Sequence, residues 1–181
     1  MARTVALLDR DGTLNVDNGY VYRSQDFHWI PDAVAALKRL SDAGIAIAVV
    51  TNQSGIARGM YTAVDVEKLH QYMRDQLALQ QVSLDAVAYC PHSADDDCAC
   101  RKPCTAMAAQ IEDQIGEEID YPSSWMIGDK PSDVEFGIRL GVRTALIRSR
   151  YWNPSDLHVK PDFQIDSLSK AVEIVLDSRQ A

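Results

Sequence analysis

The chain has 181 residues, 46% hydrophobic and 24% charged, which is typical of a globular protein, so we expect a single domain over residues 1–181. Its net charge of −8 disfavours non-specific binding to nucleic acid or acidic membranes. No signal peptide is recognisable, and the longest later apolar run, residues 45–50, is too short to span a membrane. All four cysteines lie between positions 90 and 104, a local cluster that favours the reducing cytoplasm. We also expect a monomer.

Segments typical of strands and helices alternate along the chain. Short apolar runs predict buried strands at residues 5–8, 45–50, 84–89, 125–127, 144–147 and near 163. Helical spacing of apolar residues predicts helices from Pro31 to Gly44, from a capping box at Thr62 and Asp65 to about 80, and over 106–115, 132–140 and 168–176. This order indicates an α/β fold with a doubly wound, mainly parallel sheet and helices on both faces. Residues 15–30 look irregular and aromatic, and we interpret them as a small flap.

Polar clusters follow the predicted strands. They comprise Asp9 and Asp11, then Thr51 and Asn52, then Arg101 and Lys102, then Asp129 and Lys130. A doubly wound sheet brings the carboxyl ends of its strands to one edge, so these side chains should converge in one crevice. Acids that can bind Mg²⁺ and lysines that can bind phosphate suit phosphoryl transfer. Taken alone, the first acidic pair could equally be a solvated turn before Gly12.

The cysteine-rich loop is a second signal. Its candidate metal ligands are Cys90, His92, Cys98 and Cys100. Three thiolates and an imidazole form a normal tetrahedral zinc set, and with no open position that zinc would be structural. It would brace Arg101 and Lys102, which directly follow the last ligand. Inert buried thiols or a local disulfide are the alternatives, and Cys104 could replace His92 as a ligand.

Four motifs, in order and spacing, resemble those of the haloacid dehalogenase superfamily of aspartate-nucleophile phosphatases. They are Asp9-Arg10-Asp11-Gly12-Thr13, Thr51-Asn52, Lys102 and Gly128-Asp129, and the match covers nearly the entire chain. More narrowly, the sequence resembles the D-glycero-D-manno-heptose-1,7-bisphosphate 7-phosphatases. The segments that carry this resemblance are 9–16, 19–21, 51–59, 90–92, 98–103 and 128–130.

The resemblance implies a role for each motif residue. Asp9 would be the nucleophile, and Asp11 the general acid and base. Thr51 and Lys102 would hold the transferring phosphoryl group. The catalytic Mg²⁺ would be bound by Asp9, by Asp11 through its backbone carbonyl, and by Asp129, and the cysteine loop would bind the structural Zn²⁺.

A further set of residues is expected to contact the phosphorylated sugar. Its members are Asp17, Asn18, Gly19, Tyr20, Asn52, Gln53, Ser54, Arg101 and Lys130. Arg101 is the leading candidate for the second phosphate and Arg58 a weaker one, because an arginine fork can hold two phosphate oxygens. Surface ion pairs are the alternative for Arg101 and Lys130. Asp133 is expected to cap the following helix or to orient Lys130.

The implied activity is magnesium-dependent removal of the C7 phosphate of the heptose bisphosphate through an aspartyl-phosphate, a step toward lipopolysaccharide heptose. One alternative is a histidinol-phosphate phosphatase, which residues 51–59 disfavour because those enzymes typically carry Asp-Gly after the glutamine. Another is a non-catalytic zinc-bearing module, which the intact acids and Lys102 disfavour. The chain departs from the family at residues 104–106, where a Pro-Gly pair is usual, and in the short loop between His92 and Cys98.

Overall fold

Six parallel strands form one sheet in the structure, a computed structural model that describes residues 2–155 and 157–179. The strands are β1 (Val5–Leu8), β2 (Ala46–Asn52), β3 (Ala86–Cys90), β4 (Trp125–Gly128), β5 (Arg143–Ile147) and β6 (Phe163–Ile165). Their order across the sheet is β3-β2-β1-β4-β5-β6, with every pair parallel. The chain therefore winds outward in both directions from β1, which confirms the predicted doubly wound sheet.

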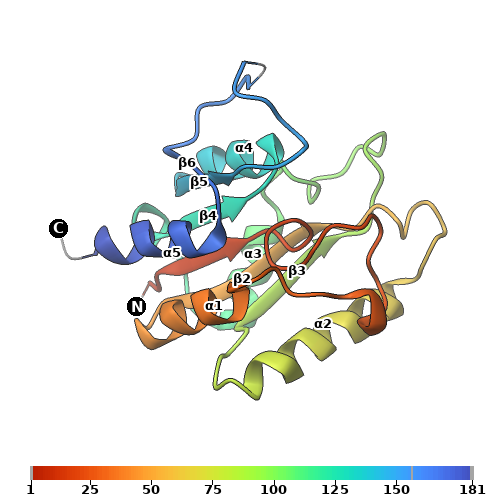
Figure 1. The fold of residues 1–181 in the computed structure, drawn as a ribbon. Helices are drawn as coiled ribbons and strands as arrows, with labels where there is room; N and C mark the ends of the chain where they lie inside the picture. Colours follow the sequence, from red (N-terminus) through yellow and green to blue (C-terminus); the bar gives the residue numbers. More distant parts are fainter. Residues whose placement is uncertain (1, 156, 180–181) are drawn as a thin grey trace.

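Helices cover both faces of this sheet (Figure 1). On one face lie α1 (Ala33–Asp42), α2 (Ala63–Ala78) and α5 (Leu168–Asp177), and on the other lie α3 (Met107–Ile115) and α4 (Pro131–Leu140). Short 3₁₀ turns occur at η1 (Ser24–Asp26) and η2 (Tyr121–Ser123). Among the described residues, no helix combines the length and the apolar character needed to cross a membrane.

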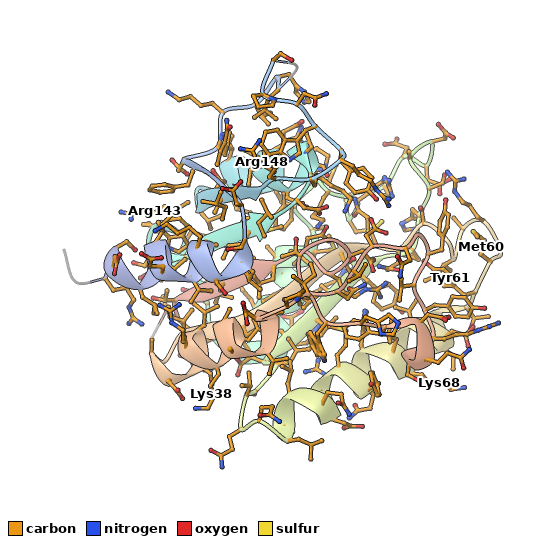
Figure 2. All side chains as sticks on the ribbon, in the orientation of Figure 1. Lys38, Met60, Tyr61, Lys68, Arg143 and Arg148 are labelled. Carbon is orange, nitrogen blue, oxygen red and sulfur yellow. The ribbon has the colours of Figure 1, made fainter. Side chains whose placement is uncertain are left out.

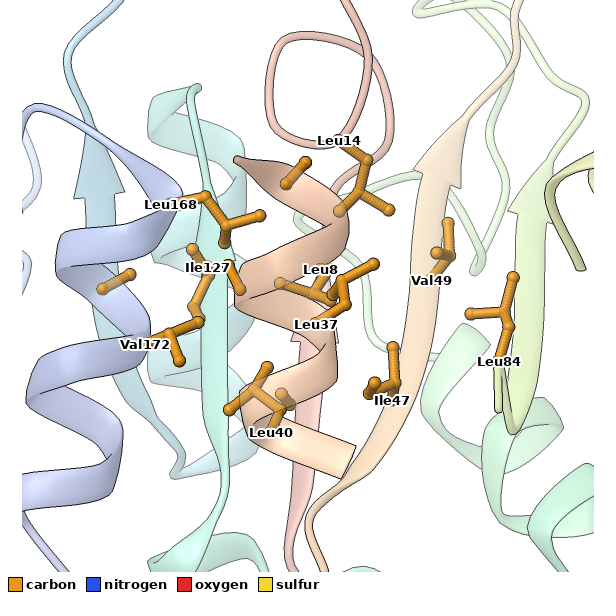
Figure 3. Packing of buried hydrophobic residues seen from close by; sticks show 14 of the residues in the cluster. Leu8, Leu14, Leu37, Leu40, Ile47, Val49, Leu84, Ile127, Leu168 and Val172 are labelled. Atoms are coloured by element: carbon orange, nitrogen blue, oxygen red, sulfur yellow. The ribbon is translucent and has the colours of Figure 1, made fainter. Parts of the chain in front are cut away.

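Side chains that alternate along the strands divide the core into two layers. Ala6 and Leu8 of β1 pack toward α1 and α5, whereas Val5 and Leu7 pack toward α3 and α4. Both sets are fully buried, which explains why the strand reads as a continuous apolar run. In Figure 3, Leu37 of α1 lies over the central strands of the sheet, in the core layer that also contains Leu8.

Element boundaries agree with the sequence to within a residue or two, with one correction at the start of α1. The predicted capping box of α2 is present, because Asp65 N–H donates to Thr62 Oγ1 at 3.2 Å and Thr62 N–H donates to Asp65 Oδ2 at 2.9 Å. Pro31, in contrast, does not begin α1. Asp32 adopts a left-handed conformation with φ of 65°, so the helix begins only at Ala33.

The two ends of the predicted flap are joined to each other by backbone hydrogen bonds. Ile30 N–H donates to Leu14 O at 2.8 Å, and Val16 N–H donates to His28 O at 2.9 Å. These bonds hold the two ends of the segment together and leave its tip beside the carboxyl ends of the central strands (Figure 1). The fold thus presents the flap to the edge where the polar clusters end.

Candidate active site

A cavity of about 440 Å³ lies at the carboxyl edge of the sheet, and most of the sequence-predicted residues line it. Those that do are Asp9, Asp11, Asp17, Gly19, Tyr20, Thr51, Asn52, Gln53, Ser54, Arg101, Lys102 and Lys130. Asn18 is exposed and is not among the lining residues, and neither is Arg58, whose guanidinium lies 5.8 Å from the centre of the Tyr20 ring. Asp129 lies buried beneath Lys130.

Asp9 is a buried carboxylate held between two ammonium groups. It directly follows β1, and Lys102 Nζ donates to its Oδ1 at 3.0 Å while Lys130 Nζ donates to its Oδ2 at 3.2 Å. Burial alone would raise the pKa of Asp9, but Lys102 and Lys130 outweigh it and hold that pKa well below its usual range. The carboxylate is therefore ionised and available as a nucleophile.

Lys102 is fixed at both its backbone and its ammonium group. Its backbone N–H donates to Asn52 Oδ1 at 3.0 Å, and Asn52 Nδ2 donates back to Lys102 O at 3.2 Å. The ammonium also donates to Val50 O and lies 2.7 Å from Asp133 Oδ1. Burial would lower the pKa of Lys102, but Asp133 and Asp9 raise it above its ordinary value, so the group stays cationic.

The three oxygens that the family resemblance implies as Mg²⁺ ligands surround the ammonium of Lys130. Lys130 Nζ donates to Asp9 Oδ2 at 3.2 Å, to Asp11 O at 2.9 Å and to Asp129 Oδ1 at 2.9 Å. Two carboxylates and a backbone carbonyl around one cation fit the all-oxygen coordination that Mg²⁺ prefers. Burial and the neighbouring Asp9 raise the pKa of Asp129 to about 8, and a divalent cation there would favour its ionised form.

Gly12 makes this oxygen cluster possible. Its φ is +92°, a conformation that other residues rarely adopt, and a Cβ at this position would lie 2.2 Å from Asp129 Oδ2. Only a residue without a side chain lets the loop after β1 approach the end of β4 so closely. The Asp-Gly pair is thus part of the cluster, not a solvated turn.

The carboxylate of Asp11 is held by three side chains. Arg10 Nη2 donates to Asp11 Oδ2 at 2.8 Å and to Oδ1 at 3.0 Å. Asn15 Nδ2 donates to Oδ1 at 3.0 Å, and Gln53 Nε2 donates to Oδ2 at 2.9 Å. Both carboxylate oxygens of Asp11 thus have fixed partners, which sets the direction in which they face the cavity.

The structure adds three lining residues that the sequence analysis did not single out: Tyr61, Ser132 and Tyr151. Tyr61 lies on the loop before α2, beside the flap (Figure 2), and its hydroxyl donates to Gln53 Oε1 at 2.8 Å. The Tyr151 ring lies 4.7 Å from Lys130 Nζ, and its hydroxyl donates to Asp17 of the flap. Both tyrosines are isolated aromatic residues in irregular segments, so no periodicity identified them.

Asp133 has both a capping role and a contact that the sequence did not predict. Its Oδ2 accepts from the backbone N–H of Lys130 at 3.0 Å, which caps α4 as expected. Its Oδ1 pairs with the ammonium of Lys102. Asp133 therefore supports the lysine beside Asp9, from the helix that follows β4.

The predicted zinc ligands form one compact group. Cys90, His92, Cys98 and Cys100 bring their ligand atoms within 4.8 Å of one another. These three cysteines and Cys104 are free thiols, so the described part of the chain contains no disulfide. The three sulfur–sulfur distances are 3.1, 3.8 and 3.9 Å. A tetrahedron with metal–sulfur bonds of about 2.3 Å has edges of about 3.8 Å, which two of the three distances match. His92 offers Nδ1, which lies 3.2 Å from Cys100 Sγ, and Cys104 lies outside the group. The cluster is compatible with zinc.

An acidic pair after β1, a buried lysine beside it and a third acid after β4, all on a doubly wound sheet, define the aspartate-nucleophile phosphatases of the haloacid dehalogenase superfamily. Residues 4–159 match the sequence profile of the polynucleotide kinase 3 phosphatase family. The chain belongs to this family and, within it, to the group of the D-glycero-D-manno-heptose-1,7-bisphosphate 7-phosphatases.

Three relatives illustrate the similarity. The D-glycero-beta-D-manno-heptose-1,7-bisphosphate 7-phosphatase of Pseudomonas aeruginosa is 38% identical over 150 residues, which cover 82% of this chain and 83% of that protein. The protein of the same name from Escherichia coli K12 is 40% identical over 156 residues, 81% of each chain. The crystal structure of the D,D-heptose 1,7-bisphosphate phosphatase from B. bronchiseptica, in complex with magnesium and phosphate, superimposes with a TM-score of 0.83. It is 28% identical in sequence, covering 97% of this chain and 99% of that one.

Proposed function

We propose that this chain is a magnesium-dependent phosphatase that removes the C7 phosphate of D-glycero-D-manno-heptose 1,7-bisphosphate through an aspartyl-phosphate intermediate. The observation that carries the proposal is the ionised Asp9 carboxylate, buried between Lys102 and Lys130 on a cavity lined by hydrogen-bond donors. The names of the relatives support the substrate. The magnesium and phosphate bound to the enzyme from B. bronchiseptica support the chemistry.

In the first half-reaction, Asp9 attacks phosphorus while Thr51 and Lys102 bind the equatorial oxygens of the transferring group. The bond between phosphorus and the sugar oxygen breaks, and Asp11 gives its proton to that oxygen. In the second half-reaction, Asp11 takes a proton from water, which attacks the aspartyl-phosphate. Inorganic phosphate leaves, and the carboxylate of Asp9 is restored.

Two metal ions complete the proposal. Mg²⁺ would be held by the carboxylates of Asp9 and Asp129 and the backbone carbonyl of Asp11, and it would offset the charge that carboxylate and phosphate bring together. Zn²⁺ would be held by the cysteine loop and would keep Arg101 and Lys102 in place. The guanidinium of Arg101 donates to His92 O at 3.2 Å, which supports this coupling.

Arg101 is our proposed contact for the phosphate that remains on the sugar. It lines the cavity next to Lys102, and its planar fork suits two phosphate oxygens. In a chain of net charge −8, a second dianion needs such a local cation. We further propose a monomeric, single-domain enzyme of the cytoplasm, in keeping with its free thiols, that contributes to lipopolysaccharide heptose.

The test is phosphate release from a panel of sugar bisphosphates, sugar monophosphates and histidinol phosphate, with Asp9→Asn as the matched control. We expect the heptose bisphosphate to have the highest kcat/KM and Asp9→Asn to be inactive while remaining folded, because an amide cannot attack phosphorus. Preference for histidinol phosphate would favour the alternative function. Substantial turnover by Asp9→Asn would contradict the covalent mechanism.

A further inference from the structure

Arg10 lies between the two motif acids in sequence, yet its side chain is fully buried and does not line the cavity. Its guanidinium forms a fork with the carboxylate of Asp11, with Nη2 at 2.8 Å from Oδ2 and Nε at 3.2 Å from Oδ1. A paired contact of this kind fixes direction as well as distance. Asn15 and Gln53 also hold Asp11, so its orientation depends in part on what holds Arg10.

The guanidinium of Arg10 is also held from three other parts of the fold, and Gln53 Oε1, after β2, accepts from Nη2 at 3.3 Å. Nη2 donates to Val21 O of the flap at 2.6 Å. Nη1 lies 3.2 Å from Nε2 of His70, which belongs to α2 and is 5% exposed. Because a guanidinium has no acceptor, Nε2 of His70 must accept this hydrogen bond, and the neutral ring carries its proton on Nδ1.

This contact links α2 to the residues around the cavity. His70 lies on the buried face of α2, beside Leu69 and Met73, and Arg10 is fully buried, so solvent has little access to this contact. Without an acceptor at this place, Nη1 would be an unpaired buried donor, and Arg10 would move to recover a partner. Any such movement turns the fork that holds Asp11.

We propose that His70 is a positioning residue for the acid–base steps: acting through Arg10, it fixes the orientation of the Asp11 carboxylate toward the leaving oxygen. The inference rests on the proposed function, since it takes Asp11 as the general acid and base. Burial, together with Arg10 and Arg74, lowers the pKa of His70 to about 3, so the ring remains a neutral acceptor near neutral pH.

Comparing kcat/KM for substrates with different leaving groups distinguishes a positioning role from a purely structural one. A sugar alkoxide must be protonated as it leaves, whereas para-nitrophenolate is a stable anion and leaves without a proton. The value of kcat/KM reports the steps up to phosphorylation of Asp9, so a misplaced general acid lowers it for the sugar phosphate and not for para-nitrophenyl phosphate.

The experiment compares His70→Phe, which keeps a ring but removes the acceptor, with His70→Gln, whose amide oxygen can accept from Arg10. We expect His70→Phe to lower kcat/KM for the heptose bisphosphate by about 10- to 100-fold. The loss on para-nitrophenyl phosphate should be less than about threefold, and His70→Gln should recover most of the activity on the sugar. Thermal unfolding checks the fold of both variants, and His70→Met is a second acceptor-free variant if the first does not fold.

Equal losses on both substrates, an unchanged kcat/KM in the acceptor-free variants, or no recovery in His70→Gln would overturn the positioning role. Failure of the proposed substrate is distinguishable from these outcomes. If the unvaried chain prefers another alkyl phosphate of the panel, the substrate assignment is wrong, and the same comparison run with that phosphate decides the role of His70. If the unvaried chain hydrolyses no phosphate ester, both proposals are wrong.

Discussion

Lowering the pH should reduce the free energy of unfolding because His70 is buried as a neutral ring. The size of the effect depends on how far burial lowers the pKa of His70. Arg10, from the loop after β1, contacts the ring, and the ring centre of Tyr89 of β3 is 5.7 Å away. The positive charge of Arg74, on the same helix, also acts on the ring. Desolvation and the two arginines lower the pKa of His70 from 6.5 to about 3. Below pH 6.5 the unfolded chain therefore binds a proton that the folded chain does not. The free energy of unfolding consequently decreases as the pH is lowered.

The magnitude follows from the gap between the two pKa values. Each pH unit between them costs about 1.4 kcal/mol, so at about pH 5, roughly 1.5 units below the unfolded value, the loss is about 2 kcal/mol. For a chain of this size that lowers Tm by roughly 4–8 °C. The penalty is absent above pH 6.5 and grows until the pH reaches the folded pKa.

The assay is thermal unfolding of the unvaried chain and of His70→Gln at pH 7.5 and at pH 5. Other groups titrate equally in both proteins, so the difference between the two pH-dependent losses isolates His70. We expect the unvaried chain to lose about 2 kcal/mol more than His70→Gln. Equal losses in the two proteins would refute a buried neutral histidine.

Four further outcomes are expected. Gly12→Ala should weaken both Mg²⁺ binding, measured by calorimetry, and turnover, because its Cβ would lie 2.2 Å from Asp129 Oδ2; unchanged Mg²⁺ affinity would contradict this. Cys98→Ser should lower the zinc content found by metal analysis and reduce activity, and full activity without zinc would exclude the bracing role. Arg101→Ala should impair use of the bisphosphate far more than that of para-nitrophenyl phosphate, chiefly in KM if the contact is equal in ground and transition states; equal losses would mean that Arg101 serves the transferring group. Leu37→Ala should lower the free energy of unfolding by about 2–5 kcal/mol in denaturant titrations, because Leu37 is fully buried between α1 and the sheet, and a loss below about 1 kcal/mol would mean that the core refills the space.

The strands and the order of the polar clusters were accessible from the sequence because both depend on short-range patterns. A strand buried on both faces reads as a run of apolar residues, as at Val5–Leu8, and the sheet then carries the end of each run to a common edge. The ligand spacing from Cys90 to Cys100 is likewise local. The left-handed Asp32 was missed because Pro31 is also compatible with a helix start, and the pattern alone does not separate the two cases.

Contacts between segments distant in the sequence were decided only by the tertiary structure. His70 shares the buried face of α2 with Leu69 and Met73, so its spacing marks it as a core position and says nothing about a polar partner. Arg10, 60 residues earlier, lies opposite it only because α2 packs over the loop after β1. Local periodicity specifies which face of an element is buried. The side chain that meets this face is specified by how the elements pack, and the direction of Asp11 depends on that packing.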